Sequence, residues 1–181
     1  MLYKGEKNML LESIKTRRST RKFTDKNVTK EEIEILLEAA MLAPSGCNTR
    51  PWRFIVIKNR DLMEQIADVH GYANMMKTAP VCIAVIALPK AQEGHKDDLP
   101  KGFYPQDCAA ATQNILIQAE ALGLGSCWCG VYPRDTTIEA IRNVLQVPDD
   151  EIPFCLIAIG EKDEFPKPRG RFEPEKVSWV M

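Results

Sequence analysis

Two short basic segments of this chain could hold an anion. Residues 17–22 read RRSTRK, and residues 169–171 read RGR. Guanidinium groups bind phosphate oxygens through paired hydrogen bonds, and a serine hydroxyl such as Ser19 adds a donor. In an extended chain residues i and i+2 face the same side, so Arg169 and Arg171 can converge on one anion. Each segment is interpreted either as solvated surface or as part of a site for a single phosphate.

Two further segments combine small polar residues, glycines and an indole. Residues 43–52 read APSGCNTRPW, and residues 123–130 read GLGSCWCG. Small hydrogen-bonding residues suit the edge of a flat polar heterocycle, and glycines let a backbone approach its face. Cys127 and Cys129 lack the Cys-x-x-Cys spacing of a redox motif, and zinc would need further ligands. The alternatives are a plain helix-to-strand loop for the first segment, and core packing or a thiol redox pair for the second.

Asn74 and Lys77 precede an apolar stretch and offer an amide and a cation. Alone, they are as well explained as surface residues. No Ser/His/Asp set, phosphate-binding glycine loop or pair of carboxylates has a recognisable spacing. We therefore assign neither a catalytic side chain nor a metal site.

Short strands and amphipathic helices must position these segments. The clearest helix covers residues 29–42, where Thr29 and Glu32 have capping-box spacing and apolar residues recur at helical intervals. Thr136 and Glu139 repeat that spacing at the start of a later helix. The predicted helices are 9–16, 29–42, 61–70, 105–122 and 136–145, and the predicted strands are 54–57, 81–88, 126–129 and 153–160.

The apolar run Val81–Leu88 is flanked by prolines and predicts a central strand covered on both faces. The whole pattern predicts one α+β domain over residues 1–181, with a central sheet flanked by helices. The polar stretch 89–104 is long for a loop in a compact domain, which favours a role in binding.

Composition excludes several classes of protein. The chain has 181 residues with 24 Lys+Arg and 25 Asp+Glu, so it lacks the basic excess of a nucleic-acid binder. Its 45% hydrophobic and 27% charged residues are typical of a globular domain. Its longest apolar run, of about eight residues, is too short to span a membrane, and no export signal appears. We expect a cytoplasmic protein whose six cysteines remain free thiols.

Taken in order, these segments resemble the nitroreductase family of FMN-dependent oxidoreductases. The likeness covers nearly the whole chain and lies in the order and spacing of RRSTRKF, APSGCNTRPWRF, QDCAAATQNILIQAEALGLGSCWCG, IPFCLIAIG and PRGR. It implies a nitroreductase-like α+β fold with a central mixed β-sheet. It also implies a homodimer with two FMN sites at the subunit interface, where the alanine-rich helix at 106–122 would lie.

The resemblance also implies roles for individual residues. Arg50 stands where the family commonly has glutamine, which leaves its contact open between an acidic substrate, a phosphate of the reductant and solvent. The ribityl phosphate would be held by Arg17, Arg18, Ser19 and Arg21, and by Arg169 and Arg171 from the tail; Pro44, Ser45 and Asn48 would approach the flavin from the other subunit; Asn74 and Lys77 would lie at its pyrimidine end; and Trp128, Cys129 and Gly130 would lie along the ring near N5.

The implied chemistry is that of the cofactor. NADH or NADPH would deliver hydride to flavin N5, and the reduced flavin would pass electrons to a nitroaromatic, a quinone or a similar small molecule in a ping-pong cycle. Lys77 near N1 and O2 would stabilise the anionic reduced flavin. The alternatives are reductive dehalogenation, oxidation of a peptide heterocycle, or a flavin-binding sensor or partner protein without turnover.

Overall fold

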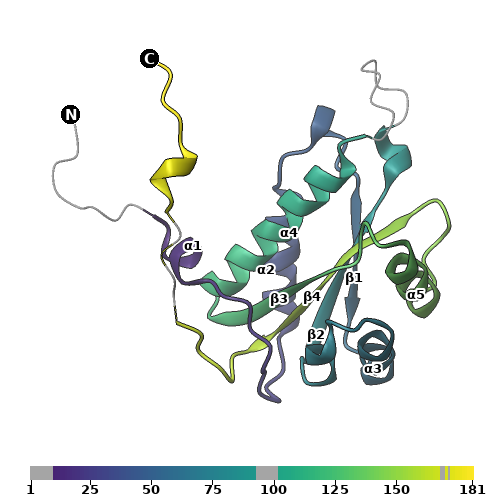
Figure 1. Ribbon diagram of the computed structural model, residues 1–181. Coiled ribbons are helices and arrows are strands. Elements are labelled where there is room, and N and C mark those ends of the chain that lie inside the picture. Colours follow the sequence, from purple (N-terminus) through teal and green to yellow (C-terminus); the bar gives the residue numbers. More distant parts are fainter. Residues whose placement is uncertain (1–9, 93–101, 168–169, 171) are drawn as a thin grey trace.

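A four-stranded sheet with the strand order β1-β2-β4-β3 lies at the centre of the molecule (Figure 1). The computed structural model describes residues 10–92, 102–167, 170 and 172–181. Neighbouring strands all pair antiparallel. The expectation of a mixed sheet is therefore wrong for these strands, and the described parallel pairing is one isolated bridge, Ser19 to Ser126, beside β3. The strands are β1 (Trp52–Ile57), β2 (Val81–Ala87), β3 (Leu124–Gly130) and β4 (Ile152–Glu161).

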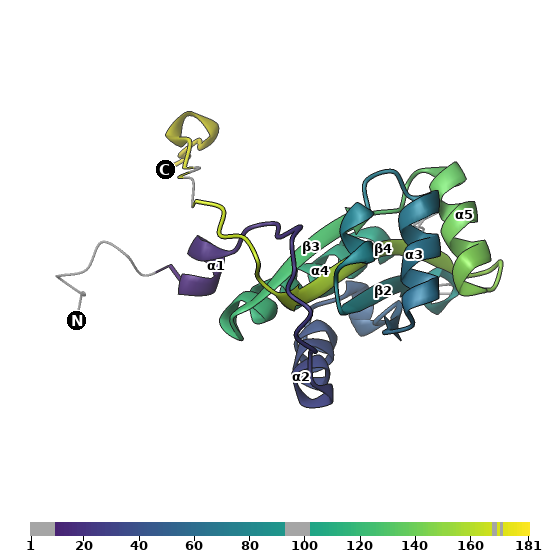
Figure 2. The same cartoon turned by 90° about the horizontal axis from the view of Figure 1, so that it is seen from below.

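Helices cover both faces of this sheet. Figures 1 and 2 show α2 and α4 on one face and α3 and α5 on the other. The α-helices are α1 (Glu12–Thr16), α2 (Lys30–Met41), α3 (Arg60–Val69), α4 (Tyr104–Ala121) and α5 (Asp135–Leu145), and the 3-10 helices are η1 (Gly46–Asn48), η2 (Asn74–Lys77), η3 (Pro89–Gln92) and η4 (Pro174–Lys176). The α+β class expected from the sequence is confirmed.

A hydrophobic core lies on each face of the sheet, and β2 contributes side chains to both. Every residue of this strand is buried, which confirms the predicted central strand. Successive side chains of a strand point to opposite faces. Cys82, Ala84 and Ile86 accordingly pack into the cluster beneath α3 and α5, while alternate residues such as Ile83 and Val85 pack into the cluster beneath α2 and α4.

Of the two capping boxes predicted from the sequence, one is confirmed by the structure and the other is wrong. At α2 the predicted capping box forms: the backbone N of Glu32 donates to Thr29 Oγ1 at 3.1 Å, and the backbone N of Thr29 donates to Glu32 Oε2 at 2.8 Å. The box predicted from Thr136 is wrong. Helix α5 begins at Asp135, so Thr136 lies inside the first turn and cannot cap it.

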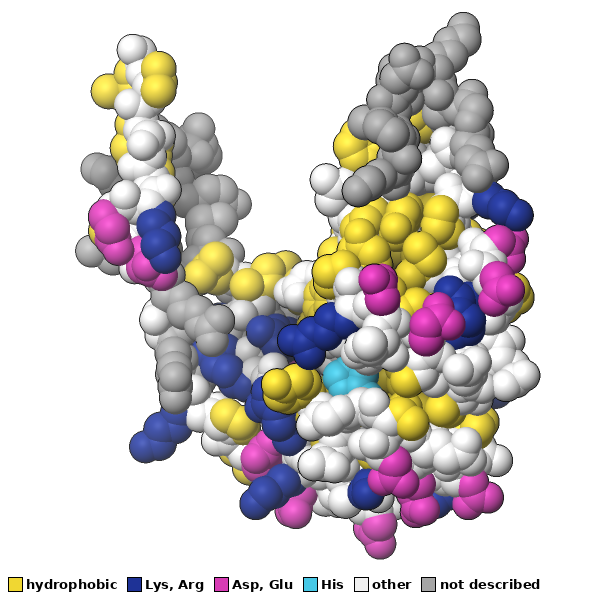
Figure 3. Space-filling view, turned by 45° about the vertical axis from the view of Figure 1, so that its right-hand side comes forward, with side chains coloured by type: hydrophobic (Ala, Val, Ile, Leu, Met, Phe, Trp, Pro, Cys, Tyr) yellow, Lys and Arg dark blue, Asp and Glu magenta, His cyan; other side chains and the backbone are white. Residues whose placement is uncertain are grey.

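The C-terminal segment, residues 172–181, stands apart from the body of the molecule. Figures 1 and 3 show it on the same side as α1. Phe172 and Trp179 are each 83% exposed there, and Val180 is 98% exposed. Such apolar exposure is typical of a segment that packs against something else. No helix in the described ranges has the length and apolar character needed to cross a membrane.

Candidate functional site

The basic segment near the N-terminus lies against the edge strand β3. The backbone N of Thr20 donates to the carbonyl of Ser126 at 2.9 Å, and Thr20 is buried. A Cβ on Gly125 would lie 2.7 Å from Thr20 Cγ2, so the close approach of the two chains requires glycine at this position. The strand therefore fixes Ser19 and Arg21 beside Cys127.

The arginines of this segment differ in what they contact. The guanidinium of Arg18 donates to the carbonyls of Arg17, Lys15 (3.1 Å) and Lys167 (3.4 Å), so backbone groups already hold it. Within the described residues, the side chains of Arg17 and Arg21 have neither a hydrogen bond nor an ion pair. Figure 3 shows Lys and Arg side chains gathered where the C-terminal segment meets the body. Two unpaired guanidinium groups near Ser19 suit a phosphate.

Cys127 faces this basic segment and is 3% exposed. A hydrogen bond from the Cys129 side chain, the charge of Arg21 and a hydrogen bond from Ser19 together lower the pKa of Cys127 to about 7, against the opposing effects of burial and of the Glu164 charge. The same hydrogen bond and burial raise the pKa of Cys129. The pKa values of the two thiols are thus shifted in opposite directions, which keeps thiol chemistry open as an alternative for this pair.

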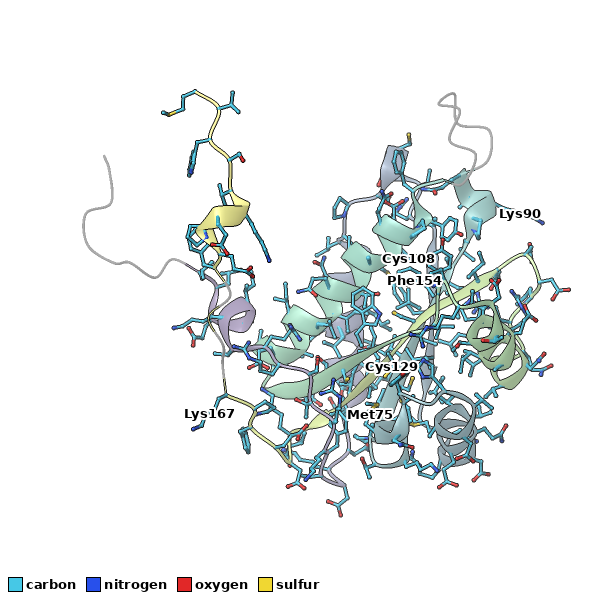
Figure 4. The ribbon with its side chains drawn as sticks, in the orientation of Figure 1. Met75, Lys90, Cys108, Cys129, Phe154 and Lys167 are labelled. Atoms are coloured by element: carbon cyan, nitrogen blue, oxygen red, sulfur yellow. The ribbon has the colours of Figure 1, made fainter. Side chains whose placement is uncertain are left out.

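Cys129 extends the same face of β3 toward η2. Its Sγ lies 3.5 Å from Met75 Sδ, and Figure 4 shows these two labelled side chains close together. Asn74 and Lys77, the exposed ends of η2, therefore lie near Cys129. Lys77 Nζ is 2.8 Å from Asp68 Oδ1, and the hydrogen bond to Asp68 together with its charge raises the pKa of Lys77.

The Trp128 side chain lies on the opposite face of β3 from those of Cys127 and Cys129. The Trp128 ring packs toward Phe154 at 6.1 Å between centroids, on the face opposite Cys127 and Cys129. On the cysteine face Trp128 can therefore offer only its backbone. At exposed Gly130 a Cβ would meet nothing within 4 Å, so space is open beside this backbone. The Gly130 carbonyl is 2.9 Å from His70 Nε2, which fixes its orientation.

The loop with Pro44, Ser45 and Asn48 lies elsewhere in the molecule. Ser45 Oγ accepts from the backbone N of Arg50 at 2.9 Å, and Asn48 is exposed. The loop contacts the beginning of α4, whereas the basic segment lies beside the last turn of that helix (Figure 1). At about 1.5 Å per residue this places the two regions roughly 20 Å apart along the helix. One chain does not bring them together.

Arg50, Arg169 and Arg171 are the remaining residues that the sequence singled out. Arg50 is exposed and lines a cavity of about 510 Å³ with Thr49, Arg53 and the apolar side chains of Leu37, Met41, Trp52 and Phe54. Arg53 is paired with Glu151, whereas the Arg50 side chain has no such partner in the described ranges. Arg169 and Arg171 lie outside the described residues. In the described part of the chain, no group of three or more His, Cys, Asp and Glu gathers as a metal site would require.

Asp107 has a buried structural role that was not predicted from the sequence. It is 6% exposed in the first turns of α4 and accepts hydrogen bonds from the Gly46 backbone N and from Gln92 Nε2. The available signal was its position one turn before Ala111, on the apolar face of a helix, where a carboxylate needs a buried partner.

The edge of β3 offers the groups that a phosphate-bearing flat heterocycle such as FMN requires. Arg17 and Arg21, unpaired among the described residues, stand at one end, and Asn74 and Lys77 stand at the other. Between them, the small side chains of Cys127 and Cys129 are only 3% and 4% exposed and pack into the core. Space is open beside Gly130. The order of these groups along the strand matches an anionic tail, a flat body and a polar ring edge.

Comparison with known proteins identifies the family of this chain. The family model described as "Nitroreductase family" matches residues 14–161. A candidate NADH dehydrogenase/NAD(P)H nitroreductase of Methanothermobacter thermautotrophicus is 44% identical over 174 residues, covering 96% of this chain and 88% of that protein. A crystal structure of a candidate enzyme of the same description from Parabacteroides distasonis has a TM-score of 0.87 at 33% identity, covering 96% of this chain and 98% of that one.

A further structure, a candidate nitroreductase from Desulfovibrio desulfuricans in complex with FMN, has a TM-score of 0.79 at 29% identity and covers 97% of this chain and 99% of that one. The likeness thus spans the basic segment, the sheet and α4, in the order found here. The fold expected from the sequence is confirmed. The chain belongs to the nitroreductase family.

Proposed function

We propose that this chain is an FMN-dependent oxidoreductase that takes electrons from NADH or NADPH and reduces nitroaromatic, quinone or similar electron-poor small molecules. The observation that carries the proposal is that the guanidinium groups of Arg17 and Arg21, which have no partner among the described residues, belong to a segment held beside β3 by the Ser19–Ser126 bridge. The FMN in the Desulfovibrio relative and the NAD(P)H in the names of others support the choice of cofactor and reductant.

The basic segment would bind the phosphate of FMN. Arg17, Arg21 and Ser19 supply charged and hydroxyl donors, while Arg18 would act by holding the segment through its backbone contacts. Arg169 and Arg171 would add charge from the tail. Charge-assisted hydrogen bonds of this kind are roughly twice as strong as neutral ones, so they should dominate the affinity.

The ring would lie against the end of β3, where space is open beside Gly130. Cys129, Gly130 and the backbone of Trp128 would contact it, and Asn74 would hydrogen-bond its polar edge. When bound, FMN supplies hydride chemistry at N5 and two-electron transfer to a second substrate. Lys77, which is paired with Asp68 in this structure, would turn toward the ring and stabilise negative charge that develops there.

A homodimer would complete the site. Pro44, Ser45 and Asn48 lie far from the basic segment within one chain, so a second copy is needed if both are to contact one flavin. The exposed apolar residues Leu42 (77%), Phe172 and Trp179 (both 83%) support such an interface. Light scattering should give a mass near twice 20.4 kDa, whereas a mass near 20.4 kDa with FMN bound would contradict the dimer.

The decisive experiment is a visible spectrum followed by an anaerobic titration. Purified protein should show the two visible flavin bands, and NADH or NADPH should bleach them. A colourless protein that does not bind added FMN would overturn the proposal. Steady-state assays with nitroaromatic, quinone and halogenated acceptors would then identify the substrate class. Bleaching without turnover of any acceptor would favour the sensor or partner-protein alternative.

A further inference from the structure

The loop from Ser45 to Arg50 adopts an unfavourable backbone. Cys47, Asn48 and Arg50 have φ values of 52°, 56° and 47°, in the left-handed region that side chains other than glycine rarely adopt. Such residues persist only where the surrounding structure over-determines them, and they concentrate at functional sites. Groups outside the loop must therefore hold it in this conformation.

Asp107 is the principal group that holds it. Its two carboxylate oxygens lie 3.1 and 3.2 Å from the backbone N of Gly46, which donates to them. Gln92 Nε2 donates to Asp107 Oδ2 at 2.8 Å and to Thr49 Oγ1 at 3.0 Å, and Thr49 Oγ1 donates to the Gly46 carbonyl at 2.9 Å. A single buried carboxylate thus ties α4 and η3 to both ends of the strained segment.

The surroundings of the Gln92 side-chain amide are a second observation, independent of the backbone angles of the loop. Its Oε1 is buried and has no hydrogen-bond partner among the described residues. A Cβ on Gly102 would lie 2.5 Å from that oxygen, and Gly102 itself has a φ of +61°. Glycine adopts this φ without strain, and its lack of a Cβ leaves room for the Gln92 amide. The amide is thereby seated with its Nε2 on Asp107, although its Oε1 has no partner among the described residues.

We infer that Asp107, supported by Gln92, is a positioning residue that fixes Ser45 and Asn48 in the conformation that meets the flavin. The inference rests on the proposed function, since it assigns the loop to the flavin site. Asp107 would not touch the cofactor. It would act through Gly46, the residue between Pro44-Ser45 and the left-handed turn, so that the loop is already ordered when FMN binds. Ordering the loop in advance lowers the entropic cost of binding.

The test compares FMN and riboflavin affinities of the FMN-depleted full chain by fluorescence titration. In Asp107→Asn either orientation of the new amide would point its NH2 at the Gly46 backbone N or at Gln92 Nε2, donor against donor, and both dissociation constants should rise at least tenfold. Their ratio should stay that of the unchanged protein, because the phosphate contacts are intact. In the double variant Asp107→Asn/Gln92→Glu a donor again faces an acceptor, so affinity should partly recover.

The matched control is Asn114→Ala on the same helix. It removes a 2.9 Å bond from Asn114 Nδ2 to the Ala39 carbonyl and leaves the loop untouched. It should lower the unfolding midpoint without changing FMN affinity. If Asp107→Asn behaves like Asn114→Ala, Asp107 is merely structural and the inference is wrong.

If Asp107→Asn does not fold, Gln92→Met removes the clamp alone, and unchanged FMN affinity in that variant overturns the inference. Failure of the unchanged protein to bind FMN is a separate result. It would overturn the proposed function.

Discussion

The Arg17–Arg21 segment and the Ser45–Arg50 loop would both present polar side chains to the flavin, but different forces hold them. The first is seated by a β-bridge to Ser126 and has no left-handed residue, and its key guanidinium groups are unpaired within the described residues. The second contains three left-handed residues, and its hydrogen bonds are satisfied by the protein itself. The first should therefore contribute charge and affinity, and the second shape and position.

The largest effect is expected from a substitution at Gly125, where residues 17–22 pack against β3. Gly125→Val would place side-chain atoms where Thr20 now lies, because even a Cβ would come within 2.7 Å of Thr20 Cγ2. Overpacking of this kind should lower the free energy of unfolding by about 3 kcal/mol and abolish FMN binding. Urea unfolding and flavin fluorescence would measure these effects. Gly71→Ala, where a Cβ meets nothing within 4 Å, should leave both unchanged.

Removing one charge should weaken binding without unfolding the segment. Arg17→Ala should weaken FMN binding by about 1.5–3 kcal/mol if a charge-assisted phosphate contact is lost. Riboflavin, which lacks the phosphate, should bind this variant as it binds the unchanged protein. Lys22→Ala, which removes an exposed neighbouring charge, is the control. Unchanged FMN affinity in Arg17→Ala would remove Arg17 from the site.

Cys127 reports on the charge of the same region through pH. Because the pKa of Cys127 is lowered to about 7, the fraction of Cys127 present as thiolate should rise from roughly one tenth at pH 6 to roughly nine tenths at pH 8. The ultraviolet absorbance of the thiolate in a Cys47→Ser background should follow this curve, and it does not require a reagent to reach the buried thiol. Arg21→Ala should move the midpoint to higher pH because a cation that favours the thiolate is lost. A midpoint well above pH 9 in the unchanged protein would contradict the lowered pKa.

The smallest expected effect tests the strain of the loop. Cys47→Gly places glycine at a φ of 52°, where the side chain is exposed, and should raise the free energy of unfolding by about 1 kcal/mol. Cys47→Ala retains the steric conflict and should not stabilise the protein. Equal stabilities of the two variants, measured by thermal unfolding, would show that the loop is not strained at this residue.

Local patterns predicted most of the elements but not all their details. The helices at α2 and α4 and the buried strand β2 follow directly from apolar periodicity, a capping box and flanking prolines. The box at Thr136 failed because capping depends on where the helix begins, and Asp135 already occupies its first turn. The sheet is antiparallel because pairing is decided by long-range connections, which a strand's own residues do not record.

The candidate site divides in the same way. The types and order of Arg17, Ser19, Lys77 and Cys129 were readable from the sequence, and so was their likeness to one family. That Arg18 contacts backbone, that Lys77 pairs with Asp68 and that the Trp128 ring faces away were not readable. Each depends on a neighbour distant in the chain or on the register of β3.

By itself the sequence determined the residue types, their spacing and the secondary structure, because these depend on side-chain chemistry and short-range periodicity. Only the tertiary structure decided that Cys127 meets Ser19 and Arg21, that a buried Asp107 holds a strained loop, and that the two halves of the proposed site lie at opposite ends of α4. The physical reason is that these contacts join residues far apart in the chain. Their distances are set by strand pairing and by the packing of α4 on the sheet.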